Sequence, residues 1–423
     1  MGSVVEINPL TRVEGHGSLK VYLDGIRVER VELCLTESPR LFETLLLDKS
    51  YAEVPEIICR ICSLCSTVHK VTALLAVEKA LGIRVSPATE LTRELITNGG
   101  LIQDHALHLY CLLLPDLLNL PGVTGLAQTA PELLKAGLAI KRVGNLIQET
   151  VGGRLIHPVN IRLGGLGQGI GHDPLLHMQN ELQEILPACR EACRLFLKPF
   201  DFPKLPAPNY LALDPAGPAY SQDFLQMTAG GSFAVADYRQ HITESVLLYS
   251  HAKYARVLGQ EATVGALSRL NLGAGLSAEA SVIFETVKEE IIGKDIRGNN
   301  LAQAIELLQA TERSLEVIGE LLQIGRDGAG NVQIVPGSGR GSAACEAPRG
   351  VLIHSYSFDA NGMCYEADVI TPTSLNQGAL ARDLLVLARY MEGSEQSLLV
   401  SALERLIRCY DPCISCSVHL LQL

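Results

Sequence analysis

Residues 59–70 read CRICSLCSTVHK, which places three cysteines at a spacing of three and a histidine four residues after the last. Cys59, Cys62 and Cys65 have the spacing of the first ligands of a ferredoxin-type cluster. Cys62, Cys65 and His69 instead fit one half of a metal site whose other half lies elsewhere in the chain. The two interpretations predict different folds and functions, so the rest of the sequence has to decide between them.

A second motif at the far end of the sequence favours the two-part site. Residues 409–419 read CYDPCISCSVH, which gives a CxxC pair, Cys413 and Cys416, again followed by a histidine, His419. A gap of two residues lets both sulfurs of a pair face one ion, and four thiolates can hold a soft or borderline metal. From the spacing alone, a structural zinc site, an iron–sulfur cluster and other metal sites all remain open.

The composition excludes several classes of protein. The chain has 423 residues, of which 47% are hydrophobic and 19% charged, so it can bury a large core and is not disordered. A net charge of −11 argues against nucleic acid as the main partner. No uncharged apolar run of about 18 residues predicts a membrane span, and no signal peptide is recognisable at the start, so we expect a cytoplasmic location.

The twelve cysteines are expected to be thiols or metal ligands rather than disulfides. Eight of them lie outside the two CxxC pairs, and we predict that they are buried in the core as small apolar side chains. These are Cys34, Cys59, Cys111, Cys189, Cys193, Cys345, Cys364 and Cys409.

The hydrophobic periodicity predicts a mainly α chain with small antiparallel β-sheets, an α+β fold around a central bundle of long helices. Alternating patterns predict β-hairpins at 16–35, turning at Asp24-Gly25, and at 350–370, turning at Asn361-Gly362. Helical patterns cover residues 67–82, 88–113, 131–149, 174–196, 236–258, 278–292, 299–323, 377–391 and 394–408.

The same patterns suggest one unit over residues 1–423 with three regions. We expect a β-hairpin region at 1–36, a helical bundle region at 37–335, and a C-terminal hairpin with helices at 336–423 that ends in the metal motif. The glycine-rich stretch GSGRGS at 337–342 fits no nucleotide-binding spacing. It is interpreted as a flexible loop, or as backbone that approaches a buried cofactor.

Six motifs, in order along nearly the whole chain, resemble those of the large subunit of nickel–iron hydrogenases. They are RVEGH (12–16), RICSLCSTVH (60–69), GGRLIHPVNIRLGG (152–165), EAPRGVLIH (346–354), TPTSLN (371–376) and DPCISCSVH (411–419). The resemblance implies the large-subunit fold, with the metal site between the N- and C-terminal motifs, and reversible heterolytic cleavage of H2. One departure is Ser63, which stands where the family usually has glycine.

The resemblance also implies roles for the four cysteines. Cys62 and Cys413 would be terminal ligands of nickel, with Cys413 as the base that takes a proton from H2. Cys65 and Cys416 would bridge nickel to an iron that carries CO and two cyanide ligands. Soft, strongly donating thiolates suit such a centre.

Around the metals, the resemblance implies a second set of residues. Glu14 would receive the proton and begin its path to the surface, as a carboxylate can near a metal site. Arg349 would face the open nickel position, with Asp116 and Asp411 as its acidic neighbours. The remaining roles are Thr373 as donor to a cyanide, Pro348 as a wall of the CO pocket, and His69 as hydrogen-bond partner of a bridging cysteine.

A magnesium or similar divalent ion near the C-terminal motif is also implied. Its ligands would be Glu43, His419 and the backbone carbonyl of about Val369, since oxygen-rich ligands suit Mg²⁺. Only residues 420–423 follow His419, which is shorter than the family's usual C-terminal extension. We therefore expect a subunit that matures without cleavage.

Partners follow from the resemblance. The sequence offers no further ligand set for an electron-transfer cluster, so an iron–sulfur small subunit would carry the electrons away. The length fits the branch that couples H2 to flavin and NAD(P)-, deazaflavin- or ferredoxin-linked subunits, and maturation proteins would build the centre. The alternatives are a metal-free homologue in a complex-I-like assembly, against which the four retained cysteines argue, and a zinc-stabilised scaffold.

Overall fold

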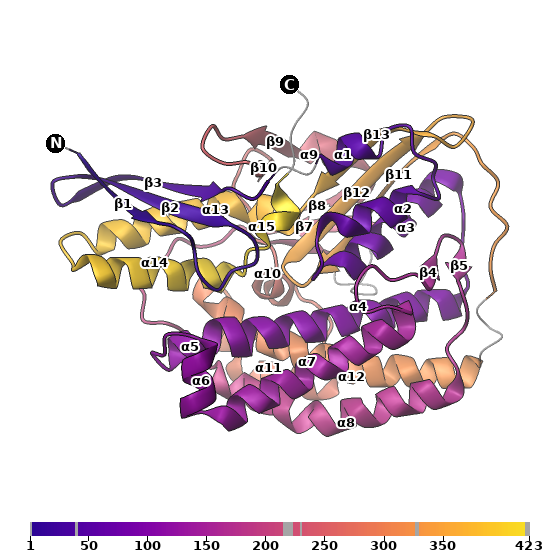
Figure 1. Cartoon of the computed structure of the whole chain (residues 1–423), viewed down its shortest axis with the longest axis horizontal. Helices are drawn as coiled ribbons and strands as arrows, with labels where there is room; N and C mark the ends of the chain where they lie inside the picture. Colours follow the sequence, from indigo (N-terminus) through magenta and orange to yellow (C-terminus); the bar gives the residue numbers. More distant parts are fainter. Residues whose placement is uncertain (1, 39–40, 215–222, 229–230, 326–329, 419–423) are drawn as a thin grey trace.

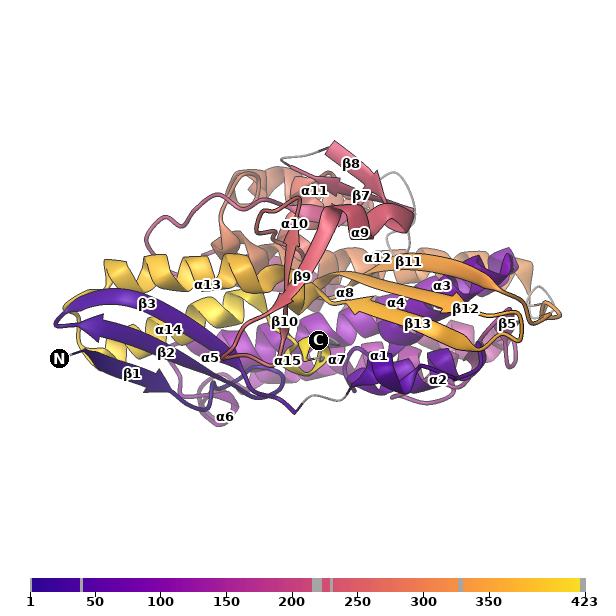
Figure 2. The same ribbon diagram turned by 90° about the horizontal axis from the view of Figure 1, so that it is seen from above.

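The computed structural model describes residues 2–38, 41–214, 223–228, 231–325 and 330–418. One layer of the molecule consists of long helices, and the two larger of three three-stranded sheets, at residues 3–35 and 339–370, lie across it with their own helices (Figure 1). Seen from above, the two sheets lie toward opposite ends of the long axis (Figure 2). The predicted fold class, mainly α with small antiparallel sheets, is confirmed.

The helical layer is built on close backbone contacts. Helix α4 begins at Pro87, after Ser86 accepts a hydrogen bond from the backbone N–H of Thr89. At Gly144 of helix α7 a Cβ atom would lie 2.6 Å from the backbone nitrogen of Gln103, so only glycine lets α7 pack this tightly on α4. The layer comprises α4 (Pro87–Leu107), a π-helical turn (His108–Leu113), α5 (Leu114–Leu117), α6 (Val123–Thr129), α7 (Pro131–Gly152), α8 (His172–Leu195), α10 (Ala266–Asn271), α11 (Ala278–Val287) and α12 (Asn299–Ile324).

The N-terminal sheet confirms the first predicted hairpin. Strands β2 (Gly17–Asp24) and β3 (Arg27–Leu35) are antiparallel, and β1 (Ser3–Ile7) adds to the other edge of β2. Helix α13 (Pro372–Tyr390) packs on β3, and α14 (Gln396–Tyr410) packs on α13. These contacts bring the two ends of the sequence together.

The second sheet confirms the hairpin predicted at 350–370 and adds a strand that we did not predict. Strands β12 (Gly350–Phe358) and β13 (Cys364–Ile370) pair as expected, while β11 (Gly339–Ala347) begins inside the glycine-rich stretch. A Cβ atom at Gly341 would lie 2.1 Å from the carbonyl oxygen of Ala76. The glycines therefore serve a close approach to a helix, α3 (Ser66–Leu81), and the interpretations as a loop or a cofactor contact were wrong.

The helix predicted at 236–258 was also wrong. Strands β9 (Ile242–Val246) and β10 (Lys253–Val257) form a two-stranded sheet there. Lys253, Ala255 and Val257 are buried at alternate positions, a period of two that the apolar content of the segment concealed. Short elements complete the fold: α1 (Phe42–Leu45), α2 (Val54–Ile58), β4 (Ile161–Arg162), β5 (Gly165–Leu166), β6 (Leu211–Leu213), β7 (Phe224–Met227), β8 (Gly231–Ala234), α9 (Tyr238–His241), α15 (Ile414–Ser417) and 3-10 turns at Cys59–Ile61, Val235–Asp237, Lys288–Glu290 and Ile296–Gly298.

Two expectations about the whole chain can be compared with the structure. All twelve cysteines lie among the described residues, are buried and carry free thiols, as predicted for the eight outside the CxxC pairs. In the part of the chain that the structure describes, no helix has both the length and the apolar character needed to cross a bilayer.

Candidate metal centre

The two cysteine pairs meet where the ends of short elements converge. Cys62 follows the 3-10 turn Cys59–Ile61, and Cys65 directly precedes α3, whose positive N-terminal end faces it. Cys413 directly precedes α15, and Cys416 lies within it. Figure 1 shows α15 between the two larger three-stranded sheets, β1–β3 and β11–β13, above the helical layer.

The C-terminal pair is placed by a sharp turn. Asp411 ends α14 in the left-handed conformation with φ 47°, which aspartate tolerates better than most residues. The chain then forms a parallel bridge between Cys413 and Glu14, in which the carbonyl of Glu14 accepts a hydrogen bond from Ile414. The RVEGH and DPCISCSVH motifs are therefore neighbours in space.

Four buried sulfurs form one cluster. The Sγ atoms of Cys62, Cys65, Cys413 and Cys416 all lie within 4.8 Å of one another. Sγ of Cys413 is 3.6 Å from that of Cys62, 3.7 Å from that of Cys65 and 3.0 Å from that of Cys416. Sulfurs around one ion at a metal–sulfur distance of about 2.3 Å are about 3.8 Å apart, so the arrangement fits metal ligation.

The charges of the cluster also fit a bound cation. Hydrogen bonds from the other sulfurs hold the pKa of Cys62 well below its usual value, whereas burial raises that of Cys416 well above it. Hydrogen bonds to Cys416 and Cys62 likewise raise the pKa of Cys413. Several thiolates crowded in a buried space repel one another, and a metal cation removes this penalty.

Glu14 lies beside the cluster. Its Oε2 atom is 3.1 Å from Sγ of Cys413 and accepts a hydrogen bond of 3.1 Å from the backbone N–H of Ser415, whose hydroxyl donates to Oε1. Burial and the charge of Cys62 raise the pKa of Glu14 above its ordinary value. This carboxyl group is therefore suited to hold a proton next to a cysteine sulfur.

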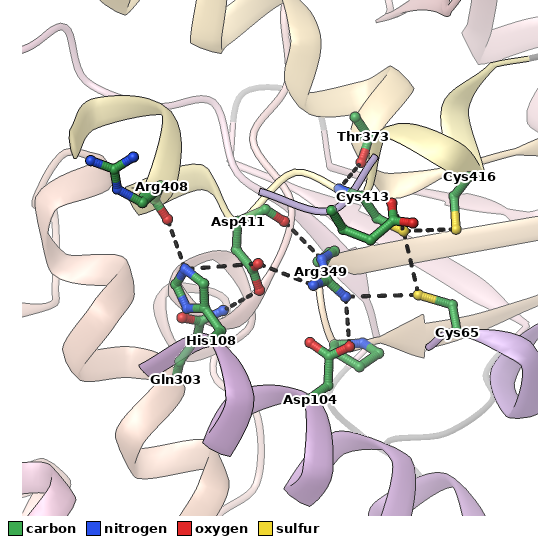
Figure 3. A network of polar contacts seen from close by, with 12 residues as sticks. Cys65, Asp104, His108, Gln303, Arg349, Thr373, Arg408, Asp411, Cys413 and Cys416 are labelled. Atoms are coloured by element: carbon green, nitrogen blue, oxygen red, sulfur yellow. Dashed lines mark hydrogen bonds and ion pairs between the residues drawn. The ribbon is translucent and has the colours of Figure 1, made fainter. Parts of the chain in front are cut away.

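Arg349 approaches the cluster from the tip of the β11–β12 hairpin, which Pro348 and Arg349 form (Figure 3). Its Nη1 atom lies 3.7 Å from Sγ of Cys65 and donates to Asp104 at 2.6 Å. Nη2 donates to Oδ1 of Asp411 at 3.1 Å, and Nε donates to the carbonyl of Asp411 at 2.9 Å. The buried guanidinium is thus fixed on two sides and has one edge toward the sulfurs.

The expectation that Asp116 neighbours Arg349 was wrong. Asp116 accepts hydrogen bonds from Arg12 and Arg408 instead. It follows the π-helical turn over His108–Leu113, whose extra residue per turn changes the direction of the side chains after it. Asp104 on α4 takes the expected place, and its Oδ1 is buried without a partner among the described residues.

The other predicted residues are placed as follows. Thr373 accepts a hydrogen bond of 2.9 Å from the backbone N–H of Cys413 through its hydroxyl oxygen. His69 Nδ1 lies 3.0 Å from Nε2 of His354, and burial lowers the pKa of His69 to about 4. Ser63 is exposed, and nothing in the structure explains its departure from the family pattern.

The predicted magnesium ligands are brought together only in part. Oε1 of Glu43 accepts a hydrogen bond of 2.8 Å from the backbone N–H of Val369. Nζ of Lys253 lies between them, 2.7 Å from Oε1 of Glu43 and 3.4 Å from the carbonyl oxygen of Val369. His419 lies outside the described residues.

Sequence reasoning missed Asp104, His108 and Gln303, whose side chains surround Arg349 and Asp411 (Figure 3). A signal existed in the stretch QDHALHLY at 103–110. It places Asp104 and His108 four residues apart, on one face of a helix. Ionisable residues on a buried face need partners, and here Asp104 pairs with Arg349 and His108 with Asp411.

Comparison with known proteins gives consistent results over the whole chain. A family model described as nickel-dependent hydrogenase matches residues 40–170 and 222–419, and a second, described as HoxL-like, matches residues 4–37. Sulfhydrogenase 2 subunit alpha of Pyrococcus furiosus is 36% identical, with 99% of this chain and 100% of that protein covered. Sulfhydrogenase 1 subunit alpha of the same organism is 34% identical, with 99% and 98% covered. The crystal structure of an NAD⁺-reducing nickel–iron hydrogenase in the H2-reduced state superposes with a TM-score of 0.87, 25% identity and 99% of each chain covered.

Proposed function

This chain belongs to the nickel-dependent hydrogenase family, and from that premise we propose how its residues handle H2 and where the electrons go. It is the catalytic subunit of a nickel–iron hydrogenase, an oxidoreductase that acts on H2. The observation that carries the proposal is the group of four buried cysteine sulfurs within 4.8 Å of one another.

The sulfurs would hold the metals in the roles that the family implies. Cys62 and Cys413 would be terminal ligands of nickel, and Cys65 and Cys416 would bridge nickel and iron. Once bound, the centre, with CO and two cyanide ligands on iron, supplies the redox chemistry that splits H2 into a proton and a hydride equivalent. The distances of 3.0–3.7 Å from Cys413 to the other three sulfurs support a shared ligand set.

The proton leaves through Cys413 and Glu14. Sγ of Cys413 accepts it, and Oε2 of Glu14 lies 3.1 Å away, within direct transfer distance. The two hydrogen bonds from Ser415 fix the orientation of the Glu14 carboxyl group toward the sulfur. Proton transfer therefore needs no large motion of either side chain.

Arg349, Thr373 and Pro348 shape the space beside the sulfurs. The guanidinium of Arg349, fixed by Asp104 and Asp411, would present its remaining donors to the metal centre and its cyanide ligands. Because the hydroxyl oxygen of Thr373 accepts from the backbone N–H of Cys413, its own O–H would be left to donate to a cyanide. Pro348 lies beside Arg349 at the hairpin tip and would wall the CO pocket.

His69 has a supporting role in this proposal. It would orient a bridging cysteine from α3, and its hydrogen bond to His354 fixes the ring. Since the buried ring is neutral, only one of its nitrogens carries a proton, so the partner of one nitrogen determines what the other can do.

Electrons would leave through a partner subunit with iron–sulfur clusters. Among the described residues, only the four-cysteine group brings three or more histidine, cysteine or acidic side chains together as potential metal ligands. The relatives named above are, by their names, subunits, and the solved structure is of an NAD⁺-reducing enzyme. We propose NAD(P) or ferredoxin as the acceptor, and a cytoplasmic location in keeping with twelve reduced cysteines.

Infrared spectroscopy of the matured enzyme tests this function. We expect bands of metal-bound CO and cyanide, nickel and one site-bound iron per chain, and H2-dependent reduction of NAD(P)⁺ or ferredoxin. A matured sample that contains zinc alone and lacks these bands would contradict the proposal. Bands without reduction of either acceptor would contradict only the proposed acceptors.

A further inference from the structure

The family resemblance implies a divalent ion held by Glu43, the carbonyl of Val369 and His419, but the described residues do not fit that ion. Nζ of Lys253 occupies the space between the two expected oxygen ligands, 2.7 Å from Oε1 of Glu43. That oxygen also accepts from the backbone N–H of Val369 at 2.8 Å. A metal could bind Oε1 only after the ammonium had been displaced.

The surroundings of Lys253 suit an ammonium group. Its three N–H donors have three acceptors: Glu43 at 2.7 Å, Glu244 at 2.9 Å and the carbonyl of Val369 at 3.4 Å. Oδ1 of Asp368 lies 3.5 Å away. Mg²⁺ requires oxygen ligands at about 2.0–2.1 Å in an octahedral arrangement, whereas these distances are those of N–H···O hydrogen bonds.

The backbone keeps Lys253 in this position. The residue is only 2% exposed, and it pairs with Val246 across the β9–β10 sheet. The alternation of β10 directs its side chain inward, on the same side as Ala255 and Val257. The preceding residue, Ala252, forms an antiparallel bridge with Val418, next to the C-terminal end of the described chain. The ammonium is thus a fixed part of the fold.

The charges around Lys253 compensate its burial. Carboxylate oxygens of Glu43, Glu244 and Asp368 lie 2.7, 2.9 and 3.5 Å from its Nζ atom. Oε1 of Glu244 is buried without a hydrogen-bond partner among the described residues. The ammonium therefore lies among more acceptor oxygens than its three N–H groups can serve.

We propose that the ammonium group of Lys253 is the permanent cation at this position and replaces the divalent metal that the family resemblance implies. It joins α1 through Glu43, β9 through Glu244 and β13 through the carbonyl of Val369. Because the bridge from Ala252 to Val418 lies directly beside it, the same cation supports the segment that carries the C-terminal cysteines. This support needs no metal from solution.

The first test measures magnesium in the assembled, matured enzyme after treatment with EDTA and desalting. We expect no stoichiometric Mg²⁺ in this subunit and the same melting temperature with and without EDTA. About one Mg²⁺ per chain that persists in the wild type and is lost in Glu43→Gln would overturn the proposal. This readout does not depend on H2 turnover, so it stands or falls separately from the proposed function.

The second test removes the ammonium and offers Mn²⁺ as a paramagnetic probe. We expect Lys253→Gln to have a lower melting temperature, to bind one additional Mn²⁺ by electron paramagnetic resonance and to regain stability with it. Lys253→Arg should bind no extra Mn²⁺. Lys70→Gln is the matched control, because Lys70 is equally buried but pairs with Glu56 and the carbonyl of Pro158. A folded Lys253→Gln that gains no Mn²⁺ and loses no stability would overturn the proposal. If that variant does not fold, the magnesium content of the wild type still decides.

Discussion

Oε2 of Glu14 lies 3.1 Å from Sγ of Cys413, although 399 residues separate them in the sequence. Their backbones are also held together, since the two residues form a parallel bridge. A carboxyl group is thereby held against a predicted nickel ligand without depending on a flexible side chain.

Glu14→Gln should lower H2 turnover by about 100-fold or more, because the amide can accept a hydrogen bond but cannot carry the proton onward. The infrared bands and metal content should stay unchanged, since Glu14 is not a ligand. Glu404→Gln serves as the control, because Glu404 also receives hydrogen bonds from the N-terminal segment but does not belong to the sulfur cluster. Normal turnover in Glu14→Gln would exclude it from the proton path.

Cys413→Ser should abolish nickel binding, while Cys409→Ser should retain it. Both cysteines are buried and lie four residues apart, but only Cys413 belongs to the sulfur cluster. Sγ of Cys409 instead accepts a hydrogen bond from Asn300. Metal analysis of the two purified variants checks the difference. Loss of nickel in both would mean that the segment, rather than the sulfur, determines binding.

Arg349→Lys should reduce turnover by about 100-fold with the fold preserved, because lysine keeps the charge but loses the planar fork. Arg349 makes separate contacts with Asp104, Asp411 and Cys65, which one ammonium cannot reproduce. Circular dichroism and activity measured on the same sample separate the two effects. Wild-type turnover would show that charge alone suffices.

Asp104→Asn and Asp116→Asn should behave differently. Asp104→Asn should lower turnover, because it weakens the support of Arg349. Asp116→Asn should lower stability by about 3 kcal/mol, because it leaves Arg12 and Arg408 without their carboxylate, but it should not change turnover per bound nickel. Denaturant unfolding and activity per nickel measure the two effects. If Asp116→Asn lowered turnover per nickel and Asp104→Asn did not, Asp116 rather than Asp104 would be the functional partner of Arg349.

His69 should make the fold sensitive to acid. Burial lowers its pKa from 6.5 to about 4, so between these pH values the unfolded chain binds a proton at this ring that the folded chain does not. Its contribution to stability is therefore complete above pH 6.5 and is lost as the pH falls toward 4. Unfolding free energies of His69→Gln should show a shallower slope in this range than the wild type. His172→Gln, at an exposed histidine, is the control for the loss of a histidine elsewhere in the chain.

Much of the centre could be predicted because chemistry restricts ligands to a few residue types at fixed spacing. The membership of the chain in the hydrogenase family, recognised from six motifs, is confirmed. The hairpins at 16–35 and 350–370 could be predicted for a similar reason, since a period of two and a tight turn are local signals.

The predictions were wrong where the position of a side chain depends on contacts between residues that are distant in the sequence. Asp104 and Asp116 are both buried acids on one helical run, and only the π-helical turn between them determines which one meets Arg349. The buried position of Lys253 was missed because, in a segment predicted to be a helix, a lysine is expected on the exposed polar face. Its role depends on Glu43, from a distant part of the chain.

The contact of Gly341 with α3 has a mechanical consequence for the centre. Cys65 directly precedes helix α3, and strand β11 ends at the hairpin tip that carries Arg349, so the two elements place these two residues relative to each other. The backbone of Gly341 packs directly against that of Ala76, and this contact fixes the position of β11 relative to α3. A contact about 20 Å along the strand from the hairpin tip therefore helps to set the distance between the sulfur of Cys65 and the guanidinium of Arg349. A methyl group added at Gly341 would push β11 away from α3 and displace Arg349 from its position beside the cluster.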